Sequence, residues 1–176
     1  MAESVLVVVD MQNDFVTGAL GTKEAEAIVP AVCQLVSHFT GTVVFTQDTH
    51  DTNYLNTQEG RYLPVPHCVK GTDGWQLVPP LAQWQATHAS QVFEKPQFGS
   101  KALATAMEQW HATKGITDIT LVGICTDICV LSNAILLKAF LPEVPIKVVA
   151  NCCAGVTPGQ HEAALMAMRS CQIEII

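Results

Sequence analysis

The chain has 176 residues, a length that fits one domain. Apolar residues make up 49% of it and charged residues 14%, which is enough apolar material to close a core and excludes an intrinsically disordered chain. The 16 acidic residues outnumber the 9 basic ones and give a formal net charge of -7. Since Lys and Arg also form no cluster, the sequence argues against binding to nucleic acid or to an anionic membrane surface.

The beginning of the chain carries no pattern typical of export or membrane insertion. The first apolar run, Val5 to Val9, is interrupted by Asp10 and is too short to span a bilayer. Glu3 stands where an export signal would carry Lys or Arg. We therefore expect a single domain over residues 1–176 that works in the cytoplasm. The seven cysteines, an odd number, are then expected to be free thiols.

Short β-rich runs alternate with longer helical ones along the chain. In chain order the sequence predicts a strand at 4–9, a helix at 23–39, a strand at 42–47, a long loop at 48–74, a short helix around Gln83, a strand at 91–94, a helix at 101–113, a strand at 119–124, a helix at 127–140, a strand at 146–151, a helix at 159–170 and a strand at 173–176. Loops as long as the one at 48–74 are usually functional in compact domains.

This alternation predicts right-handed crossovers and a three-layer α/β/α fold with a mostly parallel, doubly wound sheet. Ligands of such sheets bind outside the carboxyl ends of the strands. Polar residues therefore matter most where predicted strands end, and the sequence places there Asp10, Asp48, His50, Lys95, the run Thr126 to Cys129, and Asn151.

Cys129 is the candidate nucleophile. It lies in the first turn of a predicted helix, directly after a predicted strand. Unpaired N–H groups and the positive end of the helix dipole lower the pKa of a thiol at such a position and can also bind a developing oxyanion. Cys125 is the alternative nucleophile, although it precedes the helix proper. The opposing interpretation is a small buried side chain that only packs.

Asp10 and Lys95 are the candidate partners of this thiol. Asp10 ends the first predicted strand, where aspartate often only caps a turn. Near a thiol it would instead act as a general base. Lys95 follows the third predicted strand and would otherwise be a solvated lysine. Beside an acid and a thiol, its charge would stabilise both thiolate and carboxylate.

A second set of side chains predicts a metal site. Asp48 and His50 leave the second predicted strand two residues apart, so their side chains project to the same face. His67 follows two prolines farther along the long loop. Two His with one or two carboxylates suit a divalent ion such as Zn, Fe or Mn. Glu59 is the best additional ligand, because it is the only acid between 54 and 67.

Three segments together resemble the isochorismatase-like cysteine hydrolases, and among them the nicotinamidases. They are Val9-Asp-Met-Gln-Asn-Asp-Phe15, the region of Lys95, and Gly123-Ile-Cys-Thr-Asp-Ile-Cys129, and their order and separation match the family over nearly the whole chain. The Asp48-x-His50 pair with Pro-His67 further resembles the metal-binding loop of nicotinamidases.

The resemblance implies a hydrolase that deamidates nicotinamide to nicotinate and ammonia through a thioester, in salvage of NAD. It implies a catalytic triad of Asp10, Lys95 and Cys129, and an oxyanion hole from the backbone N–H groups of Cys125 and Cys129, with a cis peptide between Ile124 and Cys125. Implied metal ligands are Asp48, His50 and His67, with Glu59 as in some bacterial members, and zinc as the first choice over iron or manganese. Phe15 would be a wall of the substrate pocket.

One departure concerns the aromatic residue that nicotinamidases commonly place shortly before the Pro-His pair. Here Leu63 or Tyr62 takes its place as a pocket wall. The substrate could therefore be another small amide or ureide, or an isochorismate-like enol ether.

Two interpretations from other classes compete with a hydrolase, and the sequence favours neither. A nucleotide-binding module would need a glycine-rich phosphate loop, which is absent. A structural zinc site would use Cys125, Cys129, Cys152 and Cys153, but the side chains of the adjacent Cys152 and Cys153 point to opposite faces of a strand. A homo-oligomer is left open.

Overall fold

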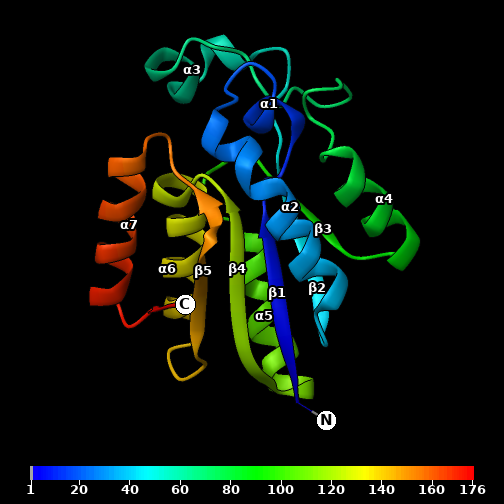
Figure 1. The fold of residues 1–176 in the computed structure, drawn as a ribbon, viewed down its shortest axis with the longest axis vertical. Coiled ribbons are helices and arrows are strands. Elements are labelled where there is room, and N and C mark those ends of the chain that lie inside the picture. The colour runs from blue at the N-terminus through cyan, green and yellow to red at the C-terminus, as the bar shows by residue number, and fades with distance from the viewer. Residues whose placement is uncertain (1) are drawn as a thin grey trace.

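The computed structural model describes residues 2–176, and a six-stranded sheet forms its centre (Figure 1). The strands are β1 (Glu3–Val9), β2 (Thr42–Asp48), β3 (Val92–Lys95), β4 (Ile116–Ile124), β5 (Ile146–Ala154) and β6 (Glu174–Ile175). They lie in the order β3-β2-β1-β4-β5-β6, and every neighbouring pair is parallel. The predicted doubly wound parallel sheet is therefore confirmed.

The unbroken apolar run of β1 explains its central position. All five residues from Val5 to Val9 are fully buried, because β2 and β4 flank the strand and helices cover both faces. Val5, Val7 and Val9 belong to one apolar cluster, whereas Leu6 and Val8 belong to the other. Alternate side chains thus face opposite layers, as the pleat of a strand requires.

Helices form a layer on each side of the sheet (Figure 1). One layer contains α5 (Lys101–Lys114), α6 (Leu131–Phe140) and α7 (Pro158–Ser170), and the other contains α2 (Lys23–His38) and α4 (Pro79–His88). In α2 the buried residues Ala25, Ile28, Val32 and Val36 recur every three or four positions, so one stripe of the helix faces the sheet.

Several predicted boundaries need correction at the carboxyl edge of the sheet. The predicted loop 48–74 contains η1 (Tyr54–Asn56), a 3-10 turn, and α3 (Gln58–Tyr62), and a short helix α1 (Asn13–Val16) was missed. The predicted helix 127–140 begins as a π-helical turn, η2 (Thr126–Val130), before α6. Asn151 does not follow β5 but lies exposed within it, because the strand continues to Ala154.

The strand order reverses between β1 and β4, and such a switch point is where parallel sheets bind ligands. The backbone turns sharply there, since Asp10 has a φ of 47° and Gly123 a φ of 120°. A Cβ atom at Gly123 would collide with the carbonyl oxygen of Val9. Glycine therefore lets β4 approach β1 closely at the point where both strands lead into the candidate site.

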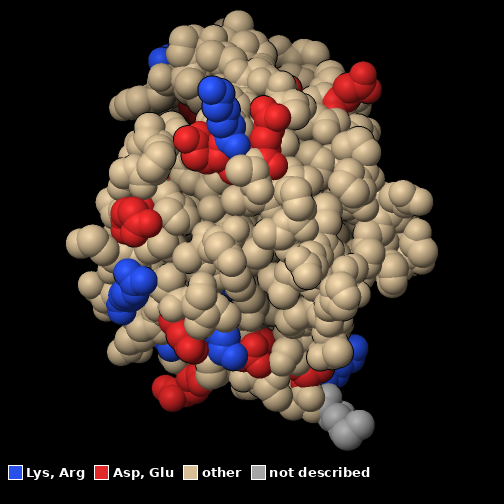
Figure 2. Space-filling model, in the orientation of Figure 1, with Lys and Arg blue, Asp and Glu red and all other residues tan. Residues whose placement is uncertain are grey.

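The surface carries few charges on the face that Figure 2 shows, and Lys and Arg there lie among Asp and Glu rather than in a broad basic patch. Across residues 2–176, no helix has the length and apolar character needed to cross a membrane.

Candidate active site

The structure brings Asp10, Lys95 and Cys129 together from three separate segments. Asp10 follows β1, Lys95 is the last residue of β3, and Cys129 lies in η2. Lys95 Nζ lies 2.6 Å from Asp10 Oδ2 and 3.5 Å from Cys129 Sγ. The three side chains are almost completely buried. An acid, an ammonium and a thiol are therefore in mutual contact at the end of the sheet.

Charges and burial set the protonation states of this group. Burial raises the pKa of Asp10, although the ammonium of Lys95 opposes the rise. Burial also acts against the charge of Lys95, but Asp10 and Cys129 outweigh it and raise the pKa of the lysine. Burial and the charge of Asp10 raise the pKa of Cys129 well above its ordinary value. The expected lowering by the helix start is thus outweighed, and burial favours the neutral form of the Cys129 thiol.

Asp10 is oriented to receive a proton. Thr46 Oγ1, on β2, donates a hydrogen bond of 2.7 Å to Asp10 Oδ1. Oδ2 contacts the lysine but, among the described residues, has no partner with hydrogen-bonding geometry. This buried oxygen therefore keeps a lone pair that can accept the proton of the Cys129 thiol.

The backbone at the end of β4 forms the turn that carries both candidate oxyanion donors. The peptide between Ile124 and Cys125 is cis, as the family resemblance implied. The carbonyl of Cys125 accepts hydrogen bonds from the N–H groups of Ile128 and Val130, which closes the first turn of η2. The N–H groups of Cys125 and Cys129 belong to this same turn, and their role toward an oxyanion stays a prediction.

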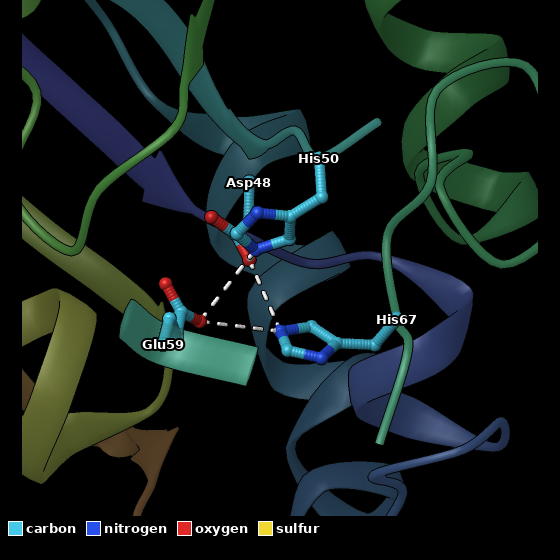
Figure 3. A group of neighbouring side chains, drawn as sticks. All are labelled: Asp48, His50, Glu59 and His67. Carbon is cyan, nitrogen blue, oxygen red and sulfur yellow. Dashed lines mark hydrogen bonds and ion pairs between the residues drawn. The ribbon is translucent and has the colours of Figure 1, made fainter. Parts of the chain in front are cut away.

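Four side chains form a second cluster beside the triad. Figure 3 shows them converging from β2, from the residues directly after it, from α3 and from the loop that follows α3. Asp48 Oδ2 lies 3.0 Å from His50 Nε2 and 3.4 Å from His67 Nε2. Glu59 Oε1 lies 3.5 Å from the first and 3.7 Å from the second of these nitrogens. One potential ligand atom of each of the four residues lies within 4.8 Å of the others.

The donor set fits a divalent cation. His67 Nδ1 donates to the carbonyl oxygen of Val65 over 2.8 Å, so its Nε2 lone pair faces the cluster. Burial and the negative charge of Asp48 raise the pKa of Glu59. Two carboxylates packed side by side repel one another, and a cation between them would relieve that repulsion. Two imidazole nitrogens with carboxylate oxygens suit zinc, iron or manganese.

Backbone pairing explains why residues so far apart meet. The N–H of His50 donates to the carbonyl of Cys68, and the N–H of Lys70 donates to the carbonyl of His50. The chain after His67 thus runs beside the end of β2. The ring of Tyr54 packs edge-on against both imidazoles, and its hydroxyl donates to the carbonyl of Leu63.

A cavity of about 280 Å³ connects the two clusters, because Cys129 lines it together with Asp48, Glu59 and His67. The predicted walls Phe15 and Leu63 both line it, whereas Tyr62 does not and is 85% exposed. Of the two candidates for the missing aromatic position, Leu63 is therefore the one at the cavity.

Sequence reasoning missed several residues of this site. Phe98, Ile128 and Val156 line the cavity. Gln12 makes three hydrogen bonds, two of them buried, that hold the backbone of Asp48 and Trp75. Gln12 lies two residues after Asp10, and this position could have indicated that it belongs to the site. The cavity walls come from loops without periodicity, so no sequence pattern identified them.

A family model described as "Isochorismatase domain" matches residues 4–176. The chain belongs to the isochorismatase family. It is 28% identical to the nicotinamidase/pyrazinamidase of Mycobacterium tuberculosis, over 97% of each chain. It is 33% identical to the nicotinamidase of Acinetobacter baylyi, over 74% of this chain and 72% of the relative. The fold matches the pyrazinamidase of Pyrococcus horikoshii in complex with zinc, with a TM-score of 0.79 and 28% identity over 99% and 98% of the two chains.

These similarities agree with the site geometry of this isochorismatase-family member. Its relatives are named as amidases, and one of them was solved with zinc. The zinc in that similar protein agrees with a donor set for a divalent metal in this chain.

Proposed function

We propose that this isochorismatase-family protein is a metal-containing cysteine amidohydrolase that deamidates nicotinamide to nicotinate and ammonia. The observation that carries the proposal is the single cavity lined both by the thiol of Cys129 and by three of the four candidate metal ligands. Sequence relatives named nicotinamidase support the choice of substrate.

The first half of the reaction forms a thioester. Asp10 takes the proton of the Cys129 thiol, while Lys95 remains charged and stabilises both anions. The sulfur adds to the amide carbon, and the oxyanion accepts hydrogen bonds from the N–H groups of Cys125 and Cys129, each contributing about 3 kcal/mol in sites of this kind. Asp10 returns its proton to the nitrogen, the C–N bond breaks, and ammonia leaves.

The second half hydrolyses the thioester. A water molecule gives a proton to Asp10 and adds to the acyl carbon, and the same N–H groups stabilise the second oxyanion. The C–S bond then breaks, the acid leaves, and the proton on Asp10 returns to the sulfur. Asp10 therefore changes protonation state twice in each half of the cycle, and its titration is coupled to that of the thiol.

Asp48, His50, Glu59 and His67 would hold the metal, which we propose to be zinc, with iron and manganese as the alternatives. When bound, such an ion would supply a Lewis acid for the ring nitrogen of the substrate or for a water near it. Phe15 and Leu63 would pack against the ring.

Ammonia release from a panel of small amides tests the proposal. Nicotinamide should be the best substrate, and removal of the metal with a chelator should reduce its turnover while readdition of zinc restores it. Absence of ammonia from every amide with metal-loaded protein would contradict the amidase assignment.

A second candidate is the hydrolysis of another small amide or ureide, or of an isochorismate-type ether. The aliphatic Leu63 favours it, because an aromatic wall would stack better on a pyridine ring. In the same panel, a carbamoyl compound turned over faster than nicotinamide would support this alternative.

Three further predictions concern the whole protein. We propose that residues 1–176 form one domain, that the enzyme works in the cytoplasm, and that it takes part in NAD salvage. Assembly into a homo-oligomer is tested by sedimentation at several protein concentrations.

A further inference from the structure

Asn133, on α6, is a buried polar residue whose side-chain amide makes three hydrogen bonds to backbone groups. Only 1% of the surface of this residue is exposed to solvent. The Nδ2 group donates to the carbonyl of Cys129 over 2.8 Å and to that of Phe98 over 3.1 Å. Oδ1 accepts the N–H of Ser100 over 2.9 Å. A buried amide with such hydrogen bonds fixes the backbone groups that it contacts relative to one another.

The groups that Asn133 joins belong to the two sides of the candidate active site. One is the carbonyl of the nucleophile itself. The others lie in segment 96–100, which begins directly after Lys95 and ends at the first turn of α5. Phe98, within this segment, also lines the cavity.

The sheet alone does not position Lys95 against Cys129. Lys95 ends the four-residue edge strand β3, which pairs only with β2. Two strands, β2 and β1, separate it from β4, which leads into the turn that carries Cys129. Any slip at the edge strand would change the distance between ammonium and sulfur, which is 3.5 Å. The side chain of Asn133 directly links the turn that carries Cys129 to segment 96–100, which follows Lys95.

We propose that Asn133 is a positioning residue that holds Cys129 in contact with Lys95 and fixes the wall formed by Phe98. It acts through the backbone of the nucleophile turn and of segment 96–100, and it does not touch the reacting atoms. The inference rests on the proposed function only where turnover is measured, because the reactivity of the thiol can be measured without a substrate.

The substitutions Asn133→Thr and Asn133→Val form a matched pair for the test. The side chains of threonine and valine have the same shape. A threonine hydroxyl on a helix can donate to the carbonyl four residues earlier, here that of Cys129, whereas a valine side chain cannot. Neither side chain has the amide that bonds segment 96–100. In Asn133→Val, the rate of alkylation of Cys129 by iodoacetamide, followed by mass spectrometry of its peptide, should fall about tenfold. The kcat for nicotinamide should fall by a similar factor. Asn133→Thr keeps the bond within the helix but loses both bonds to segment 96–100, so its two rates should fall about as far as those of Asn133→Val.

The control is Ser4→Ala, which removes a hydrogen bond to Asp118 near the opposite end of β1 and should change neither rate. If Asn133→Val does not fold, Asn133→Ser and Asn133→Ala replace the pair, and both should slow the two rates. A purely structural role would lower the melting temperature of Asn133→Val with both rates unchanged, and that result would overturn the inference. So would unchanged rates in Asn133→Thr, because the bond within the helix would then be sufficient. Slower alkylation in both variants would support the inference even if the unmodified protein released no ammonia from nicotinamide.

Discussion

At the scale of single residues, the chemistry depends on one proton shared by a carboxyl and a thiol next to a fixed positive charge. Burial raises the pKa of both Asp10 and Cys129, so they do not ionise together readily. Lys95 supplies the charge that lets one of them be anionic at neutral pH. This state suits a nucleophile that is activated by proton transfer to Asp10 once the amide is bound.

Replacing the sulfur tests this arrangement directly. Cys129→Ala should abolish ammonia release, because the proposed reaction forms its acyl intermediate on this sulfur. Mass spectrometry of the protein mixed with substrate should show an acyl adduct in the unmodified chain and none in the variant. Full activity of Cys129→Ala would remove the nucleophile assignment, whereas loss of activity in Cys125→Ala alone would move it to the alternative thiol.

Removing the ammonium should cost both activity and stability. Lys95→Met leaves Asp10 as an unpaired buried carboxylate, which should lower the free energy of unfolding by about 3–5 kcal/mol at neutral pH. Without Lys95 the raised pKa of Asp10 rises further, so the native state binds a proton more tightly than the unfolded chain does. The loss should therefore be smallest near the ordinary value of 3.8 and grow as the pH rises.

Urea unfolding at pH 5 and pH 8 measures this difference. The double variant Asp10→Asn/Lys95→Met is the matched control, because it removes both charges and should recover much of the stability without any activity. A loss of stability in Lys95→Met that is independent of pH would contradict the pairing.

At the scale of secondary structure elements, the site depends on the close approach of β1 and β4. Gly123 pairs with Val9 across the two strands, and Asp10 and Cys125 follow within two residues. The geometry of the triad and of the oxyanion turn therefore depends on a contact between backbones.

Adding one methyl group tests this contact. Gly123→Ala would place a Cβ against the carbonyl of Val9 and force alanine to adopt a φ of 120°, so the unfolding free energy should fall by about 3 kcal/mol or more. Gly159→Ala is the control, because nothing lies within 4 Å of its Cβ position in α7. It should raise stability by up to about 1 kcal/mol. Equal effects of the two substitutions, measured by urea unfolding, would contradict this account.

At the scale of the whole molecule, a bound ion would join segments that are distant in sequence. Its four candidate ligands come from β2, from the residues after it, from α3 and from the following loop. Binding to the folded state alone stabilises that state by mass action.

Removal of metal should therefore destabilise the protein as well as inactivate it. With an ion at a hundred times its dissociation constant, the stabilisation is about 2.7 kcal/mol, which corresponds to a rise in Tm of about 5–10 °C for a chain of this size. Thermal melts with zinc and with a chelator measure it, and elemental analysis gives the metal content. His67→Ala should bind less metal and show a smaller shift. An unchanged Tm in the unmodified protein would contradict the metal site.

The sequence by itself determined the fold class and the residues of both clusters. Short, unbroken, valine-rich runs such as Val5 to Val9 favour buried strands, and polar side chains directly after parallel strands meet at one edge of the sheet. Asp10, Lys95 and Cys129 could be chosen for that reason. Glu59 could be chosen because no other acid lies nearby in its segment.

Only the tertiary structure decided the protonation state of Cys129, the cavity wall and the role of Asn133. A pKa depends on burial and on charges from every side, and here those terms outweigh the helix start. Leu63 and Phe98 reach the cavity because of loop conformations that follow no periodic pattern. Asn133 contacts residues more than 30 positions earlier, and a single amide in a helix carries no signal of such partners.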